Sequence, residues 1–325
     1  MFDCHTRKID YLRISITDRC NLSCQYCDPH PFLSQGFYKE ILSYEEILRL
    51  VKLGVGLGIS KVRITGGEPL VRRGVYDFLE KIIRIKGLND VSLTTNGVLL
   101  KENIHKINSA GIKRINISLD TLNREKYKKI TGYDCFDRVW EGIASARQYG
   151  FDPIRINAVI LKGINDDELI NFAQLSLSHP FQIRFIEYMP MGATTSKKDW
   201  YIPMDEIKKK IKGAGKLTRL DSGPNDGPVK RYKLENAKGE IGFISPVSNH
   251  FCENCNRIRL TAKGNLRPCL LSDYEIGIKK ALRAKASDRQ LTDIMIKAVR
   301  SKPAGHCISK DSLSTILDSM AAIGG

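Results

Sequence analysis

The stretch Leu12-Arg13-Ile14-Ser15-Ile16-Thr17 alternates apolar and polar side chains, and it decides the fold. Successive side chains of a strand point to opposite faces, so the stretch predicts a strand with one apolar and one polar face. The same alternation predicts strands at residues 61–65, 91–95, 114–120, 154–161 and 182–187. A helical period between them predicts helices at residues 43–58, 74–86, 100–110, 134–150 and 166–178.

Strands that alternate with helices predict parallel pairing with helical crossovers. We therefore expect an α/β fold, with residues 1–200 forming an incomplete (βα)6 TIM-type barrel. From about residue 200 the composition changes. Gly and Pro cluster at residues 221–228, short strands are expected near 231–234 and 241–244, and a Lys-rich helical segment precedes Gly324-Gly325. We expect residues 201–325 to form a smaller C-terminal α+β domain that closes the barrel mouth.

The polar face of the predicted strands carries four arginines: Arg13, Arg63, Arg155 and Arg184. Helices must cover the apolar face, so the polar face lines the barrel lumen. A packed barrel fills its lumen with aliphatic side chains, whereas Arg, Ser, Thr and Asn predict a cavity for an anionic ligand. An antiparallel sheet with one solvated face would show the same alternation, but the intervening helices argue against it.

Composition narrows the classes of protein further. Lys and Arg exceed Asp and Glu by 52 to 36, and the net charge of +16 favours anionic partners, although a generally basic surface would give the same value. No apolar run reaches membrane-spanning length and the first residues do not resemble a signal peptide, so we expect a cytoplasmic protein with no membrane contact. Nine cysteines in a cytosolic protein indicate metal binding or catalysis.

Cys20, Cys24 and Cys27 follow the first predicted strand at spacings that let three thiolates converge from one loop. Full thiolate ligation of a four-iron cluster needs four cysteines, so three leave one iron open. An open position on a metal usually serves chemistry or substrate binding. A zinc site completed by His5 or His30 is the alternative that spacing leaves open.

Cys252, Cys255 and Cys269 form a second group of three. Again one iron of a cluster would be open, while a zinc knuckle completed by His250 fits the spacing equally well. The remaining cysteines fit no cluster spacing and are expected to be ordinary thiols: Cys4, Cys135 and Cys307.

The first cysteine group resembles the signature of the radical S-adenosylmethionine (SAM) superfamily, including the aromatic Tyr26 before Cys27. Gly66-Gly67-Glu68-Pro69, after the second predicted strand, resembles the glycine-rich motif of that superfamily that meets the SAM amine. The resemblance implies a 4Fe-4S cluster whose open iron binds the methionine amine and carboxylate of SAM.

From about residue 7 to its end, the chain also resembles the GTP 3′,8-cyclase family of molybdenum cofactor biosynthesis. The motifs that carry this resemblance lie at residues 64–72, 93–97, 117–120, 184–190, 255–259 and 324–325. The resemblance implies two 4Fe-4S clusters and SAM cleavage to methionine and a 5′-deoxyadenosyl radical, which takes the ribose 3′ hydrogen of GTP. The product would be (8S)-3′,8-cyclo-7,8-dihydroguanosine 5′-triphosphate, and the C-terminal cluster would hold the guanine.

Position by position, the resemblance implies three sets of contacts. GTP would contact Arg13, Arg63, Thr94, Arg155, Arg257, Ile258 and Arg259. SAM would contact Tyr26, Gly67, Ser118 and Met189, and the two groups of three cysteines would bind the clusters. Catalytic roles are expected for Arg184, Arg257 and Arg259. Independently, a triphosphate needs several fixed positive charges, and arginine binds phosphate with a bidentate fork.

The chain departs from the family pattern in two places. Arg155 stands where the family commonly has Lys, and the two are not interchangeable at a phosphate. Asp28-Pro29-His30 stands where the family usually reads Met-Pro, and an acid beside a cluster changes its redox tuning. The resemblance also implies that the Gly-Gly tail reaches the active site.

The resemblance implies a low-potential electron donor of the flavodoxin or ferredoxin type and the next pathway enzyme, cyclic pyranopterin monophosphate synthase, as partners. We expect a monomer or homodimer that binds no nucleic acid. One alternative is a twin-cluster radical SAM enzyme that modifies peptides, although such enzymes usually carry more C-terminal cysteines. The other is a zinc nucleic-acid-binding protein, which predicts basic residues clustered on an exposed face.

Overall fold

The computed structural model describes residues 1–27, 40–221, 223, 227–306, 316–318 and 320–324. Asp28, His30, Cys307 and Gly325, which entered the sequence analysis, lie outside the described residues.

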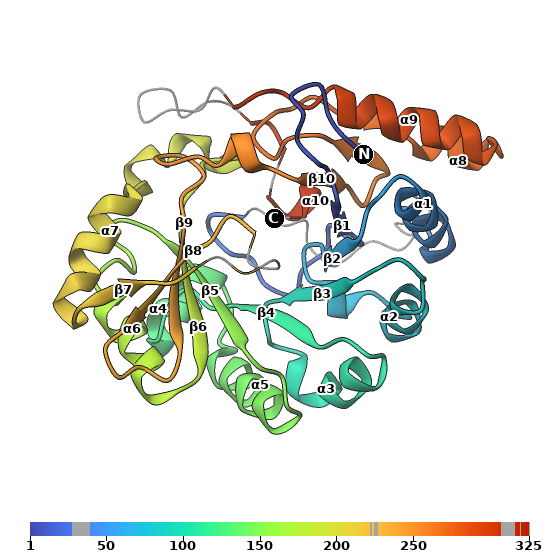
Figure 1. The fold of residues 1–325 in the computed structure, drawn as a ribbon. Coiled ribbons are helices and arrows are strands. Elements are labelled where there is room, and N and C mark those ends of the chain that lie inside the picture. Colours follow the sequence, from blue (N-terminus) through green and yellow to red (C-terminus); the bar gives the residue numbers. More distant parts are fainter. Residues whose placement is uncertain (28–39, 222, 224–226, 307–315, 319, 325) are drawn as a thin grey trace.

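Six neighbouring parallel strands form the centre of the sheet, as the alternation predicted. They are β1 (Tyr11–Ser15), β2 (Lys61–Thr65), β3 (Asp90–Thr95), β4 (Arg114–Ser118), β5 (Ile154–Ile160) and β6 (Phe181–Glu187). The crossover helices are α1 (Tyr44–Gly56), α2 (Val75–Ile83), α3 (Leu100–Ser109), α4 (Arg124–Thr131), α5 (Phe136–Gln148) and α6 (Leu169–Ser178). Figure 1 shows α1, α2, α3 and α5 on the outside of a curved sheet. The predicted α/β class with a parallel partial barrel is confirmed.

The hydrophobic core lies between the strands and the outer helices. Ile14 of β1 and Ile64 of β2 are fully buried there, together with Ile47 of α1 and Phe78 of α2. Burying one such side chain stabilises the fold by about 1.5–3 kcal/mol. The apolar faces of the strands therefore meet the helices, which leaves the polar faces on the inside of the curve.

Helix α4 was not expected from the sequence. Its residues are mostly charged, and only Tyr127, Ile130 and Thr131 are buried, so its apolar period is weak. Asn123 begins the helix by accepting a hydrogen bond from the backbone N–H of Lys126. Three strand ends also differ. β1 ends at Ser15 and β4 at Ser118, each two residues earlier than predicted, and β5 ends at Ile160, one residue earlier.

The C-terminal part of the chain extends the sheet at both edges, giving twelve strands in the order β12-β11-β10-β1-β2-β3-β4-β5-β6-β9-β8-β7. Strand β10 (Arg257–Leu260) lies parallel to β1, and β9 (Glu240–Ile244) lies parallel to β6. The other pairs are antiparallel and involve β7 (Leu217–Arg219), β8 (Lys230–Leu234), β11 (Asn265–Arg267) and β12 (Ile276–Gly277). Strands from both parts of the chain therefore share one sheet.

The remaining helices are α7 (Met204–Ile211), α8 (Lys279–Arg283), α9 (Asp288–Arg300) and α10 (Met320–Ile323). Short 3-10 turns occur at Pro69–Val71, Gly192–Ser196, Lys198–Trp200, Lys212–Ala214 and Cys252–Asn254. In Figure 1, α10 lies inside the curve of the sheet, near β1. No helix in the described part of the chain is long and apolar enough to cross a membrane.

Candidate functional site

A cavity of about 260 Å³ opens on the inside of the sheet and gathers most of the residues singled out in the sequence. The predicted residues that line it are Arg13, Cys20, Cys24, Tyr26, Cys27, Arg63, Gly67, Thr94, Ser118, Arg184, Met189, Arg257 and Arg259. The second cysteine group lines a separate cavity, and two further predicted residues, Ile258 and Arg155, line neither. Ile258 packs in the hydrophobic core because it points away from Arg257 and Arg259 on the same strand. Arg155 donates from Nε to Oε1 of Gln182 at 3.0 Å, among buried side chains.

The glycine-rich motif packs directly on the cysteine loop. The backbone N–H of Gly67 donates to the carbonyl of Thr17 at 2.7 Å, and that of Glu68 donates to the carbonyl of Arg19 at 2.7 Å. A Cβ atom at Gly67 would overlap the carbonyl of Arg19, so only glycine fits this approach. The motif therefore fixes the backbone immediately before Cys20.

Glu68 and Asn96 support the same loop, although neither was predicted as a site residue. The carboxylate of Glu68 is fully buried and accepts hydrogen bonds from the N–H of Leu70, the hydroxyl of Thr95 and the N–H of Asn96. Burial raises the pKa of Glu68 to about 7. Asn96, which immediately follows β3, donates from Nδ2 towards Sγ of Cys20 at 3.6 Å and so makes a direct polar contact with a cysteine sulfur.

The donor set of the first cysteine group fits a metal cluster. Burial raises the pKa of the Cys20 thiol to about 11 and that of Cys24 well above its usual value. Buried thiolates need compensating positive charge, which a bound metal supplies. Among the described residues, no group of three or more Cys, His, Asp or Glu side chains is arranged to hold one metal ion. The thiolates of a four-iron cluster each bind a different iron.

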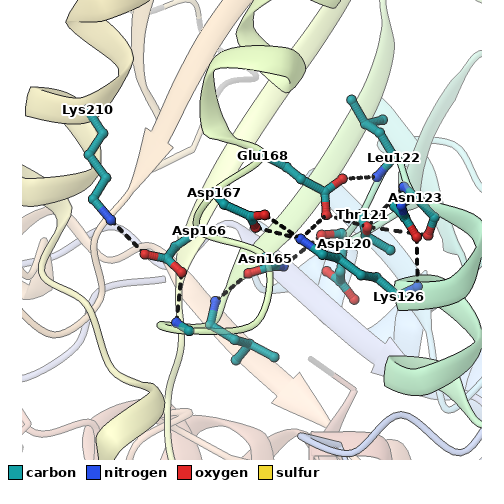
Figure 2. Close-up of polar contacts among 12 residues, drawn as sticks. Asp120, Thr121, Leu122, Asn123, Lys126, Asn165, Asp166, Asp167, Glu168 and Lys210 are labelled. Carbon is teal, nitrogen blue, oxygen red and sulfur yellow. Dashed lines mark hydrogen bonds and ion pairs between the residues drawn. The ribbon is translucent and has the colours of Figure 1, made fainter.

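Tyr26 is held by a hydrogen bond to Asp120, which lies just after β4 and lines the same cavity. Its hydroxyl donates to Oδ2 of Asp120 at 2.6 Å, while Oδ1 of Asp120 accepts from the N–H of Val159 at 2.8 Å. Burial raises the pKa of Asp120 to about 6. Figure 2 shows the network beyond Asp120, where the buried Asn165 donates from Nδ2 to the carbonyl of Asp120 at 2.6 Å. The loop after β5 thus holds the residue that orients Tyr26.

Ion pairs continue this network to the outer helices, as Figure 2 also shows. Lys210 of α7 pairs with Asp166 at 2.6 Å, and Lys126 of α4 pairs with Asp167 at 2.6 Å. Glu168 accepts from the hydroxyl of Thr121 at 2.6 Å. The loops after β4 and β5 are therefore joined by hydrogen bonds at the same end of the sheet as the cysteine loop.

The second cysteine group lines a smaller cavity of about 70 Å³, together with His250, Lys302 and His306. Five residues line both cavities and form their shared wall: Pro246, Phe251, Arg257, Arg259 and Leu270. The two cysteine groups therefore lie on opposite sides of a wall that contains two arginines. Burial raises the pKa of Cys255, but Arg257 and Lys302 lower it more, to about 6.

Three arginines lie at one level across three neighbouring strands. Arg13 of β1 is in register with Arg259 of β10 on one side and with Arg63 of β2 on the other. Burial and the charges of Arg259 and Arg63 hold the pKa of Arg13 well below its usual value. Burial and Arg257 lower the pKa of Arg259 to about 9. An anion between these side chains would relieve their mutual repulsion.

The C-terminal segment enters the same place. Nη1 of Arg259 donates to the carbonyl of Gly324 at 2.8 Å. Gly324 has a φ of 73°, and a Cβ there would overlap Oγ1 of Thr65 and lie 2.9 Å from Cβ of Ser15. The segment therefore needs glycine to approach the ends of β1 and β2.

Comparison with known proteins agrees with this geometry. Residues 14–176 match the radical SAM superfamily, and residues 181–308 match the family described as Molybdenum Cofactor Synthesis C. The crystal structure of Streptococcus suis SuiB bound to S-adenosylmethionine superposes with a TM-score of 0.61 at 15% identity, over 88% of this chain and 68% of SuiB. The anSMEcpe structure with bound AdoMet gives a TM-score of 0.58 at 16% identity, over 90% of this chain and 81% of that protein.

The chain is a radical SAM enzyme, as its fold, its cysteine loop and the family match together show. Membership of this superfamily implies a 4Fe-4S cluster and SAM. The relatives are more specific. The chain is 50% identical to the GTP 3′,8-cyclase of Thermodesulfovibrio yellowstonii, over 94% of this chain and 95% of the relative. It is 46% identical to the GTP 3′,8-cyclase of Moorella thermoacetica over the same shares. The chain belongs to the GTP 3′,8-cyclase family of molybdenum cofactor biosynthesis.

Proposed function

We propose that this chain converts GTP to (8S)-3′,8-cyclo-7,8-dihydroguanosine 5′-triphosphate, with SAM as the source of the radical. The observation that carries the proposal is the row of Arg259, Arg13 and Arg63, which lies at one level in the cavity that also holds the first cysteine group. A nucleoside triphosphate is an anion of the charge and length that such a row would bind.

At one end of the cavity, Cys20, Cys24 and Cys27 would hold a 4Fe-4S cluster, which supplies the electron that cleaves SAM. Tyr26, Gly67, Ser118 and Met189 line the same cavity and would contact SAM. Tyr26 is already oriented by its hydrogen bond to Asp120. Contacts that are in place before the ligand binds cost no reorganisation when it arrives.

In the smaller cavity beyond the shared wall, Cys252, Cys255 and Cys269 would hold a second 4Fe-4S cluster, whose open iron would bind the guanine. Arg257 and Arg259 stand between the two cysteine groups and line both cavities. They would contact the nucleotide, with Thr94 and Arg184 on the wall formed by β3 and β6. Arg155 would act on the triphosphate through the polar network that it shares with Arg184 and Gln182.

Residues 1–200 would then supply the SAM-binding core, and residues 201–325 would supply the second cluster site and close the barrel mouth. A closed site keeps water and oxygen away from a reactive radical. We also propose a cytoplasmic enzyme, monomeric or homodimeric, that takes electrons from a flavodoxin- or ferredoxin-type donor. Its product would pass to cyclic pyranopterin monophosphate synthase.

A peptide substrate is the second candidate, because the superposed SuiB is also known bound to its precursor peptide SuiA. That likeness concerns the fold alone. The arginine row favours a compact polyanion over a peptide backbone, whose recognition uses neutral hydrogen bonds at a sheet edge. A zinc nucleic-acid-binding protein would present its arginines on an exposed face, whereas Arg13 and Arg259 are buried.

Anaerobic reconstitution followed by mass spectrometry tests the proposal. The full chain is incubated with iron, sulfide, GTP, SAM and dithionite, and we expect both 5′-deoxyadenosine and the cyclised triphosphate. Cys20→Ser removes both products. Arg257→Ala keeps 5′-deoxyadenosine but loses the cyclised nucleotide. Wild-type cyclisation by Arg257→Ala would refute the role of that arginine, and SAM cleavage without any change to GTP would refute the substrate.

A further inference from the structure

Lys302 lies just after α9, beside the second cysteine group, and its residue is only 4% exposed. Its ammonium donates to the carbonyl of Arg257 at 2.8 Å and to the carbonyl of Pro268 at 2.7 Å. Arg257 follows Cys255 by two residues, and Pro268 immediately precedes Cys269. One side chain therefore ties together two chain segments that carry cysteines of the same group.

In the described part of the chain this ammonium has no carboxylate partner, because its hydrogen bonds go to these two neutral carbonyls and to the side chain of Cys255. Burying an ammonium without an anion nearby is energetically unfavourable. The groups that can supply negative charge are the cysteine sulfurs, because Lys302 lines the same small cavity as Cys252, Cys255 and Cys269. A lysine is charged at neutral pH, and thiolates that bind a cluster are anionic.

Arg7 also binds carbonyl groups of this region, but unlike Lys302 it has a carboxylate partner. It donates from Nη1 to the carbonyl of Cys252 at 2.7 Å and from Nη2 to the carbonyl of Pro303 at 2.6 Å. Its guanidinium is paired with the buried carboxylate of Asp3 at 2.6 Å. Arg7 thus fixes the third cysteine-bearing segment and the loop that carries Lys302, while its own charge is compensated nearby.

We propose that Lys302 is a positioning residue for the second cysteine group and that its ammonium sets the charge balance of the metal cluster bound there. The inference rests on the proposed function, because it takes these cysteines as cluster ligands. Reduction adds a negative charge to a cluster, and a buried cation nearby stabilises that state, so Lys302 raises the reduction potential of the second cluster. It also places Cys255 and Cys269 for simultaneous binding.

The test uses the full chain with Cys20→Ser, Cys24→Ser and Cys27→Ser as the parent, so that only the second cluster contributes a signal. Lys302→Met removes the charge at similar length, and Lys302→Arg keeps it. Lys297→Met removes a charge from an exposed position of α9 and is the matched control. Iron content and a redox titration followed by electron paramagnetic resonance are measured anaerobically, with thermal unfolding as a check on the fold.

We expect Lys302→Met to lower the reduction potential of the second cluster or to lose iron. Lys302→Arg and the control Lys297→Met should both keep the potential and the iron content of the parent. Equal potentials and equal iron content in the parent and in Lys302→Met would overturn the inference. If Lys302→Met does not fold, Lys302→Gln, which can keep one carbonyl bond, replaces it with the same expected shift. A parent that binds no four-iron cluster contradicts the proposed second cluster site itself, which is a separate outcome.

Discussion

The hydroxyl of Tyr26 and the carboxylate of Asp120 are joined by a hydrogen bond of 2.6 Å that links the cysteine loop to the chain just after β4. Asp120 cannot turn away from this bond, because its second carboxylate oxygen accepts from Val159 and its carbonyl accepts from Asn165. The aromatic ring beside Cys27 is therefore held by the part of the sheet that faces it.

Breaking this bond is expected to weaken SAM binding without unfolding the protein. A hydrogen bond to a charged group contributes about 1.5–3 kcal/mol, so Tyr26→Phe should raise the Kd for SAM by roughly tenfold or more. Asp120→Asn should act in the same direction, and the double variant should add little, because both changes remove one contact. Equilibrium SAM binding to the reconstituted protein measures this, with the exposed Tyr133→Phe as control. SAM affinities equal to wild type in both single variants would contradict the role of the contact.

The arginine row is expected to recognise the phosphates of GTP rather than its base. Arg13→Gln removes the central charge of the row, at a cost of about 1.5–3 kcal/mol in binding, or roughly 10- to 100-fold in affinity. The loss should be much smaller for guanosine, which has no phosphate. Isothermal titration of the reconstituted protein with each ligand gives the comparison, and the exposed Arg300→Gln serves as control. Equal losses of affinity for GTP and guanosine would show that Arg13 does not bind the phosphates.

Gly67 and Gly56 should respond in opposite ways to the same substitution. Gly67→Ala forces a Cβ into the carbonyl of Arg19, so we expect the cysteine loop to shift and the first cluster to be lost. Gly56 ends α1 with no atom within 4 Å of its Cβ position, and alanine there should stabilise the fold by up to about 1 kcal/mol. Iron content and thermal unfolding distinguish the two. A Gly67→Ala protein with full iron content would show that the close approach is not required.

The C-terminal segment should matter for turnover and not for stability. Gly324→Ala places a side chain against Thr65 and Ser15 at a positive φ, which should displace the segment from Arg259. We expect the yield of cyclised nucleotide to fall by at least tenfold, while the free energy of unfolding changes by less than about 1 kcal/mol. Ala322→Gly, two residues earlier, is a control for altered flexibility. Normal turnover by Gly324→Ala would remove this segment from the active site.

Local patterns in the sequence predicted the central strands and their lumen face well, because period-two alternation reports which face each side chain occupies. They could not predict how far along the barrel axis each side chain lies. Arg155 shares the lumen face with Arg13, but register places it beside Gln182, outside the lining of the cavity. The face on which a side chain lies follows from its neighbours in the chain. Its position along the barrel axis depends on the stagger of strands that are distant in sequence.

Long-range pairing escaped the sequence analysis for the same reason. Tyr11 is in register with Arg257, far along the chain, and no local signal marks that partnership. Lys302 was also missed, because two of its partners are backbone carbonyls, which carry no residue-specific signal. Asp120 and Glu68 lie within the motifs described above. The motifs alone do not show whether these carboxylates position other residues or contact a ligand directly.

The placement of β9 and β10 has a consequence for synthesis on the ribosome. Until residues 240–260 emerge, β1 and β6 each have one unpaired edge, because their outer neighbours are not yet made. Such edges invite intermolecular pairing, so the nascent chain should depend on chaperones that shield exposed strands. Both cysteine groups would then become available for cluster insertion only after the full chain is released, and not when the first six strands are complete.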